Sequence, residues 1–103
     1  MAFFLVTLTR SGPRWDASQP LEGQSGWLEH AAFMDALVED GFVVLGGPLD
    51  DEHRVVLAVE AGSERALLET LAEDPWSETH LQIASVEPWT IRLDGRGHPP
   101  TGG

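Results

Sequence analysis

Strand-like and helix-like apolar segments follow one another along this 103-residue chain in an order that strongly constrains its fold. In two stretches apolar residues recur every three or four positions, which predicts amphipathic helices. These stretches are residues 26–40 and the segment from Ser63 to Asp74-Pro75. Short runs of aromatic, β-branched and other apolar residues predict strands at 3–9, 42–45, 55–60 and 80–93. The predicted order is therefore βαββαβ.

Residues at the ends of these helices support the same boundaries. Ser25 stands where a side chain caps the first helix, and Gly41 follows its last turn. Ser63 is the matching cap of the second helix. Asp74 ends that helix because a residue before proline is disfavoured in the helical conformation.

The last predicted strand has two features of a sheet edge. Pro88 cannot donate to a strand ladder, and the alternation of apolar residues slips near Val86, which a β-bulge would explain. Two helices crossing one face of a four-stranded antiparallel sheet is the ferredoxin-like arrangement of the α+β class. The strands are apolar over nearly their whole length, so we expect the uncovered face to be buried in a homodimer.

The chain is short enough to be one domain, which we place at residues 1–93. The connection 10–25 is rich in Gly, Pro and Ser and has no period. Connections of this length are usually functional lids or disordered segments, and Trp15 and Leu21 supply apolar groups for packing. Residues 94–103 are Gly- and Pro-rich and are expected to form a flexible C-terminal tail.

The charge balance excludes several classes of partner. Six arginines, no lysine and 17 acidic residues give a net charge of −11, whereas nucleic acids and anionic membrane surfaces attract clustered positive charge. Cysteine is absent, which excludes disulfides. The apolar start lacks the basic region of a signal peptide, and no run approaches a membrane span. We expect a soluble cytoplasmic protein.

His30 and Asp74 are the candidate catalytic residues. His30 lies on the apolar side of the first predicted helix, and Asp74 follows the second. An imidazole can exchange protons near neutral pH, and a carboxylate that accepts a hydrogen bond from one ring nitrogen would orient it. The alternatives stay open, and packing is the commoner outcome: His30 at the rim of the core, and Asp74 as an Asx-type turn before proline.

Four further residues are candidates for substrate binding. Trp27 and Trp76 would form the walls of a pocket for a planar organic ligand, with core packing as the alternative. Gly47 and Pro48 would let the backbone approach that ligand, or would simply bend the strand end. No metal site is expected, because the histidines at 30, 53, 80 and 98 lack ligand spacing. No redox cofactor is implied, and no serine or threonine lies in a nucleophile motif.

Several of these elements together resemble the YCII-related domain family. They are His30, the Gly-Phe-Val-Val-Leu-Gly-Gly-Pro run at 41–48, Asp-Pro-Trp at 74–76 and Glu-Pro-Trp at 87–89. The resemblance covers about residues 3–93 and implies a ferredoxin-like fold that assembles as a dimeric α/β barrel. It also implies a site centred on His30 and Asp74. The long connection 10–25 departs from shorter relatives.

The resemblance also indicates a class of chemistry. The family includes a dehydrochlorinase that acts on a chlorinated hydroxyquinol, and its fold is similar to that of muconolactone isomerases. We therefore expect a small-molecule isomerase, lyase or dehydrochlorinase-like enzyme that uses His30 and Asp74 without metal or redox cofactor. The first alternative is a non-catalytic dimeric module that binds or senses a metabolite. A cofactor-using oxygenase of the haem-degrading type is a more remote one, since no motif points to haem or flavin.

Overall fold

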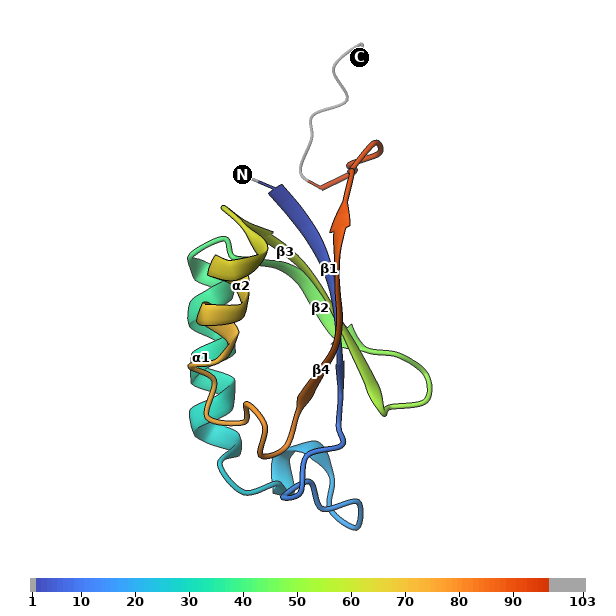
Figure 1. The fold of residues 1–103 in the computed structure, drawn as a ribbon. Coiled ribbons are helices and arrows are strands. Elements are labelled where there is room, and N and C mark those ends of the chain that lie inside the picture. The colour runs from blue at the N-terminus through green and yellow to red at the C-terminus, as the bar shows by residue number, and fades with distance from the viewer. Residues whose placement is uncertain (1, 97–103) are drawn as a thin grey trace.

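Four strands form one antiparallel sheet with the spatial order β2-β3-β1-β4. The computed structural model describes residues 2–96. The strands are β1 (Ala2–Thr9), β2 (Val43–Pro48), β3 (Arg54–Ala61) and β4 (Gln82–Trp89). Helices α1 (Trp27–Glu39) and α2 (Glu64–Leu71) lie side by side over one face of the sheet (Figure 1). The fold is therefore α+β and ferredoxin-like, as the order of apolar segments predicts.

The core lies between the sheet and the two helices. Alternate residues of a strand point to opposite faces, and the residues of β1 and β3 that point toward the helices are buried, namely Phe4, Val6, Leu8, Leu57, Val59 and Ala61. Leu37 of α1 and Leu67 and Leu71 of α2 meet them from the other layer. Full burial of one such side chain is worth about 1.5–3 kcal/mol, so these positions hold the helices on the sheet.

Strand β4 is an edge strand, which agrees with the proline at position 88. It is shorter than the predicted 80–93 segment, because His80 and Leu81 belong to the turn that follows α2. The bulge lies two residues before Val86: β1 pairs Thr7 with Ser85 but Leu8 with Ile83, which leaves Ala84 as the extra residue.

Strand β2 is longer than predicted, since Gly46 and Gly47 lie inside the strand instead of ending it. A Cβ added at Gly46 would lie 2.6 Å from Cδ2 of Leu57 on β3. A larger residue at 46 would therefore require the Leu57 side chain to shift, and the strand continues to Pro48.

The start of α1 differs from the prediction. Gly26, with a φ of 72°, is the N-cap residue, and no side chain caps the helix. The Ser25 hydroxyl, which was expected to cap this helix, instead lies 3.0 Å from Nε2 of His80 and makes a tertiary contact. The prediction for α2 is confirmed, because the Ser63 hydroxyl accepts a hydrogen bond from the backbone N–H of Ala66 at 3.1 Å.

The connection 10–25 contains the single-turn 3₁₀ helix η1 (Leu21–Gly23) and packs against the end of the molecule where α1 begins (Figure 1). Its backbone approaches the turn after α2: the N–H of Gly12 donates to the carbonyl of His80, and a Cβ at Gly12 would lie 2.4 Å from the carbonyl oxygen of Thr79. This position therefore accepts only glycine.

The uncovered face of the sheet remains partly apolar. Leu45 is 63% exposed and Trp89 is 43% exposed, and Leu45 pairs with Ala58 while Trp89 pairs with Phe3. The first residues of the predicted tail lie at one end of this face, where the Arg96 guanidinium stands 5.4 Å from the centre of the Phe3 ring. Residues 97–103 of that tail lie outside the described residues.

No helix within residues 2–96 has both the length and the apolar character needed to cross a bilayer.

Candidate functional site

His30 and Asp74 contact each other although 44 residues separate them. Nδ1 of His30 lies 2.8 Å from Oδ1 and 3.0 Å from Oδ2 of Asp74. His30 projects from the first turns of α1, and Asp74 comes from the segment that follows α2. Both residues are buried. The contact means that Nδ1–H donates to the carboxylate, which leaves Nε2 as the second ring nitrogen.

Asp74 also organises the turn in which it lies. Its Oδ1 accepts the backbone N–H of Trp76 at 2.9 Å. The two interpretations of Asp74 therefore hold together, since one carboxylate closes an Asx-type turn and also orients an imidazole. Two donors fix the position of this carboxylate, which in turn fixes the plane of the His30 ring.

Trp76 stands between two histidines. Its indole is stacked on His30 with ring centres 4.1 Å apart and an interplanar angle of 6°. On His80 the centres are 4.6 Å apart with an angle of 16°. Trp15 and Trp27 contact the same indole, each with centres 5.9 Å apart. The indole N–H donates to the carbonyl of Ser25 at 2.8 Å. Trp76 is therefore a rigid partition between the surroundings of the two histidines.

A cavity of about 160 Å³ lies beside His30, between α1 and the sheet. Its apolar wall includes Leu8, Leu21, Met34, Val55, Leu57 and Leu81. An apolar cavity of about 150 Å³ is large enough to bind benzene. Among the described residues no group bonds to Nε2 of His30. His30 is one of the residues that line this cavity, which has room for one small ring.

The charges around this cavity are unlike those of the chain as a whole. The sequence holds 17 acidic residues and six basic ones, yet no Asp or Glu lines the cavity and Arg10 does. Arg10 donates through Nη1 to the carbonyl of Glu52 at 2.7 Å, and its guanidinium lies 5.1 Å from the centre of the Trp15 ring. The other side-chain N–H groups of Arg10 have no hydrogen-bond partner among residues 2–96.

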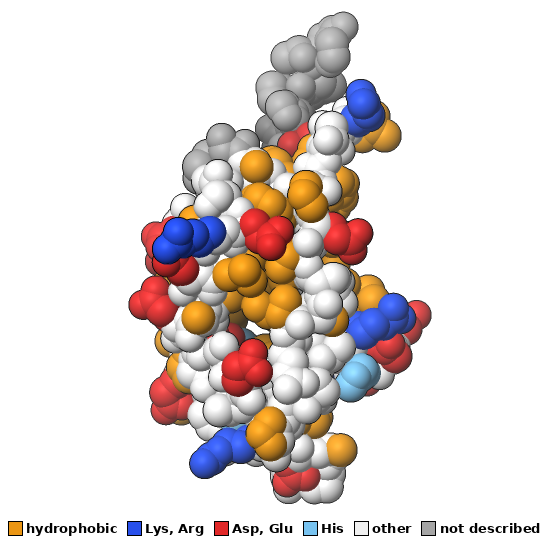
Figure 2. All heavy atoms as spheres, in the orientation of Figure 1, with side chains coloured by type: hydrophobic (Ala, Val, Ile, Leu, Met, Phe, Trp, Pro, Cys, Tyr) orange, Lys and Arg blue, Asp and Glu red, His pale blue; other side chains and the backbone are white. Residues whose placement is uncertain are grey.

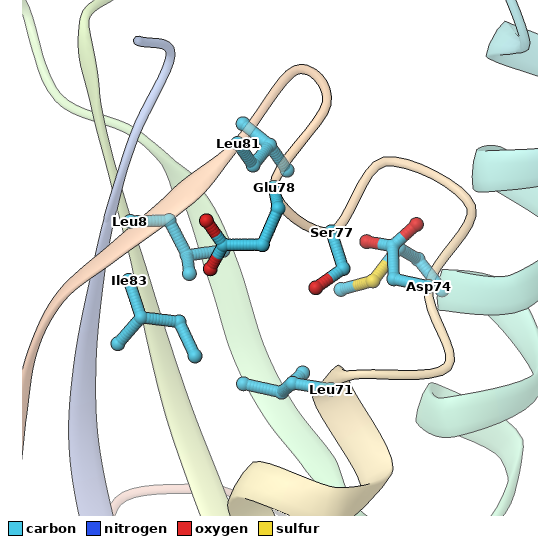
Figure 3. A pocket seen from close by; sticks show the side chains of 8 residues that line it. Leu8, Leu71, Asp74, Ser77, Glu78, Leu81 and Ile83 are labelled. Atoms are coloured by element: carbon cyan, nitrogen blue, oxygen red, sulfur yellow. The ribbon is translucent and has the colours of Figure 1, made fainter. Parts of the chain in front are cut away.

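A second, smaller hollow lies on the Asp74 side of the pair (Figure 3). Its volume is about 20 Å³, enough for one water molecule. Glu78, in the left-handed conformation with a φ of 65°, extends its carboxylate across this hollow toward Leu8.

On the outer surface, hydrophobic side chains gather around a depression between the helices and β4 (Figure 2). The larger cavity on the His30 side is the one with room for an organic ligand.

Three of the four predicted binding residues line that larger cavity: Trp27, Pro48 and Trp76. Gly47 is not among its lining residues. The reason is strand alternation, because Gly47 pairs with Val56 whereas the cavity is lined from the alternate positions Val55 and Leu57.

Sequence reasoning missed Arg10 and the pair formed by Ser25 and His80. His80 is buried against Trp76, and desolvation by burial lowers its pKa from the ordinary value; the nearby charges of Arg14 and His30 act in the same direction, and Asp74 opposes them. The only hint in the sequence is that His80 follows Trp76 by four residues, a spacing that can bring two side chains together. In the structure the backbone N–H of His80 donates to the carbonyl of Trp76.

Within residues 2–96, no group of three or more His, Asp or Glu side chains is arranged to hold a metal ion. No protein-family model matches the chain, and none of the curated proteins matches it.

Proposed function

We propose that the cavity beside His30 holds a small planar organic molecule and that His30 moves a proton on it. One observation carries this proposal: a buried histidine lines a cavity the size of one ring, with its Nδ1 bonded to a carboxylate and its Nε2 without a hydrogen-bond partner among the described residues. An imidazole held in this way is oriented for proton transfer at a single atom.

The hydrogen bond to Asp74 occupies Nδ1 of His30 and leaves Nε2 as the ring nitrogen that can exchange a proton with a ligand. With the proton on Nδ1, a neutral His30 presents the lone pair of Nε2 and acts as a general base. When Nε2 takes a proton, the Asp74 carboxylate stabilises the imidazolium that forms. Return of that proton to another atom of the ligand is an isomerisation, and loss of a leaving group instead is an elimination. The proposed class is therefore isomerase, lyase or dehydrochlorinase-like, in line with the resemblance to YCII-related domains.

Arg10 narrows the class of substrate. It is the one permanently charged side chain that lines the cavity, and most of its N–H groups have no partner among the described residues. Hydrogen bonds between guanidinium and carboxylate are charge-assisted and strong. We infer a substrate that combines a small apolar ring with a carboxylate or enolate oxygen directed toward Arg10.

This substrate class is tested with a panel of small cyclic carboxylates and hydroxylated aromatic compounds, followed by proton NMR in D₂O. We expect proton exchange, isomerisation or elimination with anionic members of the panel. The Arg10→Met variant should raise KM for those members about 10- to 100-fold, because it removes a hydrogen bond to a charged group. Their neutral methyl esters should respond much less.

Arg14→Met is the matched control, since Arg14 does not line this cavity and should leave KM unchanged. Equal KM values for Arg10→Met and the wild type would contradict the anionic class. Ligand binding that raises the melting temperature without any turnover would instead support the non-catalytic metabolite-binding module.

We also propose that a second copy of the chain covers the uncovered face of the sheet, as in a dimeric α/β barrel. The exposure of Leu45 and Trp89 on that face supports this arrangement. Sedimentation should give a mass of twice 11.2 kDa, and a Leu45→Glu, Trp89→Glu double variant should sediment as a monomer. A wild-type protein that stays monomeric at high micromolar concentration would refute the dimer.

A further inference from the structure

A second pair of reactive side chains lies on the other face of Trp76. The Ser25 hydroxyl is 3.0 Å from Nε2 of His80. Ser25 is exposed, whereas His80 is buried with its ring stacked on the indole. An accessible hydroxyl in contact with a sheltered imidazole is the arrangement of a nucleophile and its general base.

The hydrogen-bond partners around His80 fit a ring that carries its proton on Nδ1. The Thr79 hydroxyl oxygen lies 3.2 Å from the carbonyl oxygen of Pro75, to which it can donate, and 2.9 Å from Nδ1 of His80. When its single hydrogen is directed to Pro75, its oxygen accepts from Nδ1–H. In that arrangement Nδ1 carries the proton, and Nε2 accepts from the Ser25 hydroxyl, 3.0 Å away. This tautomer is the one that removes a proton from a nucleophile.

The charge state of His80 agrees with this role. Burial and the neighbouring charges of Arg14 and His30 lower the pKa of its imidazole, with Asp74 acting in the opposite direction. The neutral form, which accepts protons, therefore dominates at neutral pH.

The surroundings of Ser25 give a substrate access to its hydroxyl. A shallow depression of about 420 Å³ surrounds the pair and is also lined by Arg14, Glu29 and Pro75. Ser25 directly precedes Gly26, the N-cap of the 13-residue helix α1, whose positive end favours a developing negative charge. The bond from the Trp76 indole N–H to the Ser25 carbonyl holds the backbone in place.

We propose that Ser25 is the nucleophile and His80 the base of a second site, distinct from the His30 cavity, that acts on small acyl esters, with Thr79 as a positioning residue. The Ser25 oxygen forms a bond to the carbonyl carbon while Nε2 of His80 takes the hydroxyl proton. The bond to the alcohol oxygen then breaks, and the alcohol leaves with that proton. Water hydrolyses the acyl-serine by the reverse transfers and releases the carboxylic acid.

The test is covalent labelling of the full-length protein with diisopropyl fluorophosphate, followed by peptide mass spectrometry. Attack by the serine oxygen on phosphorus expels fluoride and leaves a stable adduct. We expect one adduct on Ser25, formed at least about 10²-fold faster than any on exposed Ser18, because base catalysis is worth about 10²–10⁴-fold. Release of p-nitrophenol from p-nitrophenyl acetate should disappear in Ser25→Ala.

Three variants at His80 and Thr79, with His53→Gln as the control, separate the roles of the neighbouring side chains. His80→Gln should slow labelling of Ser25 by about 10²–10⁴-fold, whereas His53→Gln, at an exposed position outside this depression, should not. Thr79→Val should slow labelling by a smaller factor, and Thr79→Ser, which keeps the accepting hydroxyl, should restore it.

Absence of a Ser25 adduct in the wild type would overturn the proposal, and so would equal rates in a folded His80→Gln variant. If near-ultraviolet circular dichroism shows that His80→Gln has lost its tertiary structure, Thr79→Val decides, and an unchanged rate there overturns the proposal.

Discussion

The His30→Gln variant is expected to lose about 10²–10⁴-fold in kcat on any substrate that the wild type turns over, because positioned acid–base catalysis contributes that much. The glutamine amide can still donate to Asp74 and cover part of the Trp76 ring. It cannot take a proton as Nε2 does, the ring nitrogen that the bond to Asp74 leaves available. The measurement is the initial rate by proton NMR with the best member of the substrate panel.

His53→Gln is the control for this substitution. His53 is exposed in the turn between β2 and β3 and does not line the cavity, so its replacement should leave kcat within the error of the measurement. A folded His30→Gln variant that turns over substrate at the wild-type rate would show that His30 is not catalytic and that the site is a binding pocket.

The Trp76→Ala variant is expected to lower the free energy of unfolding by about 3–5 kcal/mol, the usual cost of removing a buried aromatic side chain. Trp76 is 1% exposed and stacks on both His30 and His80. Its removal also leaves the Ser25 carbonyl without the indole N–H. Urea unfolding followed by circular dichroism measures the change.

Two companion variants calibrate that value. Trp76→Phe keeps most of the ring area and loses the indole hydrogen bond, so it should cost less than Trp76→Ala. Leu28→Ala removes a side chain from a residue of α1 that is 76% exposed and should change stability by no more than about 0.5 kcal/mol. A loss below about 1 kcal/mol for Trp76→Ala would show that neighbouring rings collapse into the space and that Trp76 does not hold the site together.

The Ser25–His80 pair shows where reasoning from the sequence stops. Ser25 stands next to the start of α1, where serine usually caps a helix. The local chemistry is the same for Ser63, which does cap α2. The difference is a partner 55 residues away in the sequence, since the Ser25 hydroxyl makes a hydrogen bond with Nε2 of His80. Short-range preference cannot anticipate a contact that exists only after the turn following α2 has packed against the start of α1.

The His30–Asp74 contact was partly predictable. Periodicity placed His30 on the buried side of α1, and Asp74-Pro75 marked the turn after α2. In a ferredoxin-like fold both helices lie over the same face of the sheet, which makes a meeting of the two side chains reasonable. The distance of 2.8 Å between Nδ1 of His30 and Oδ1 of Asp74, and the stacking of His30 on Trp76, depend on side-chain packing. The periodicity of apolar residues in the sequence carries no information about that packing.

The sequence by itself determined the order of the elements, the α+β class and the Ser63 cap, because these follow from apolar periodicity and from hydrogen bonds within a few residues. Only the tertiary structure decided that Pro48 lines the cavity whereas Gly47 does not, that Arg10 brings a positive charge to the cavity, and that one indole separates two histidines. These properties depend on strand register and on contacts between residues distant in the chain. A change of one residue in register reverses which face a side chain occupies.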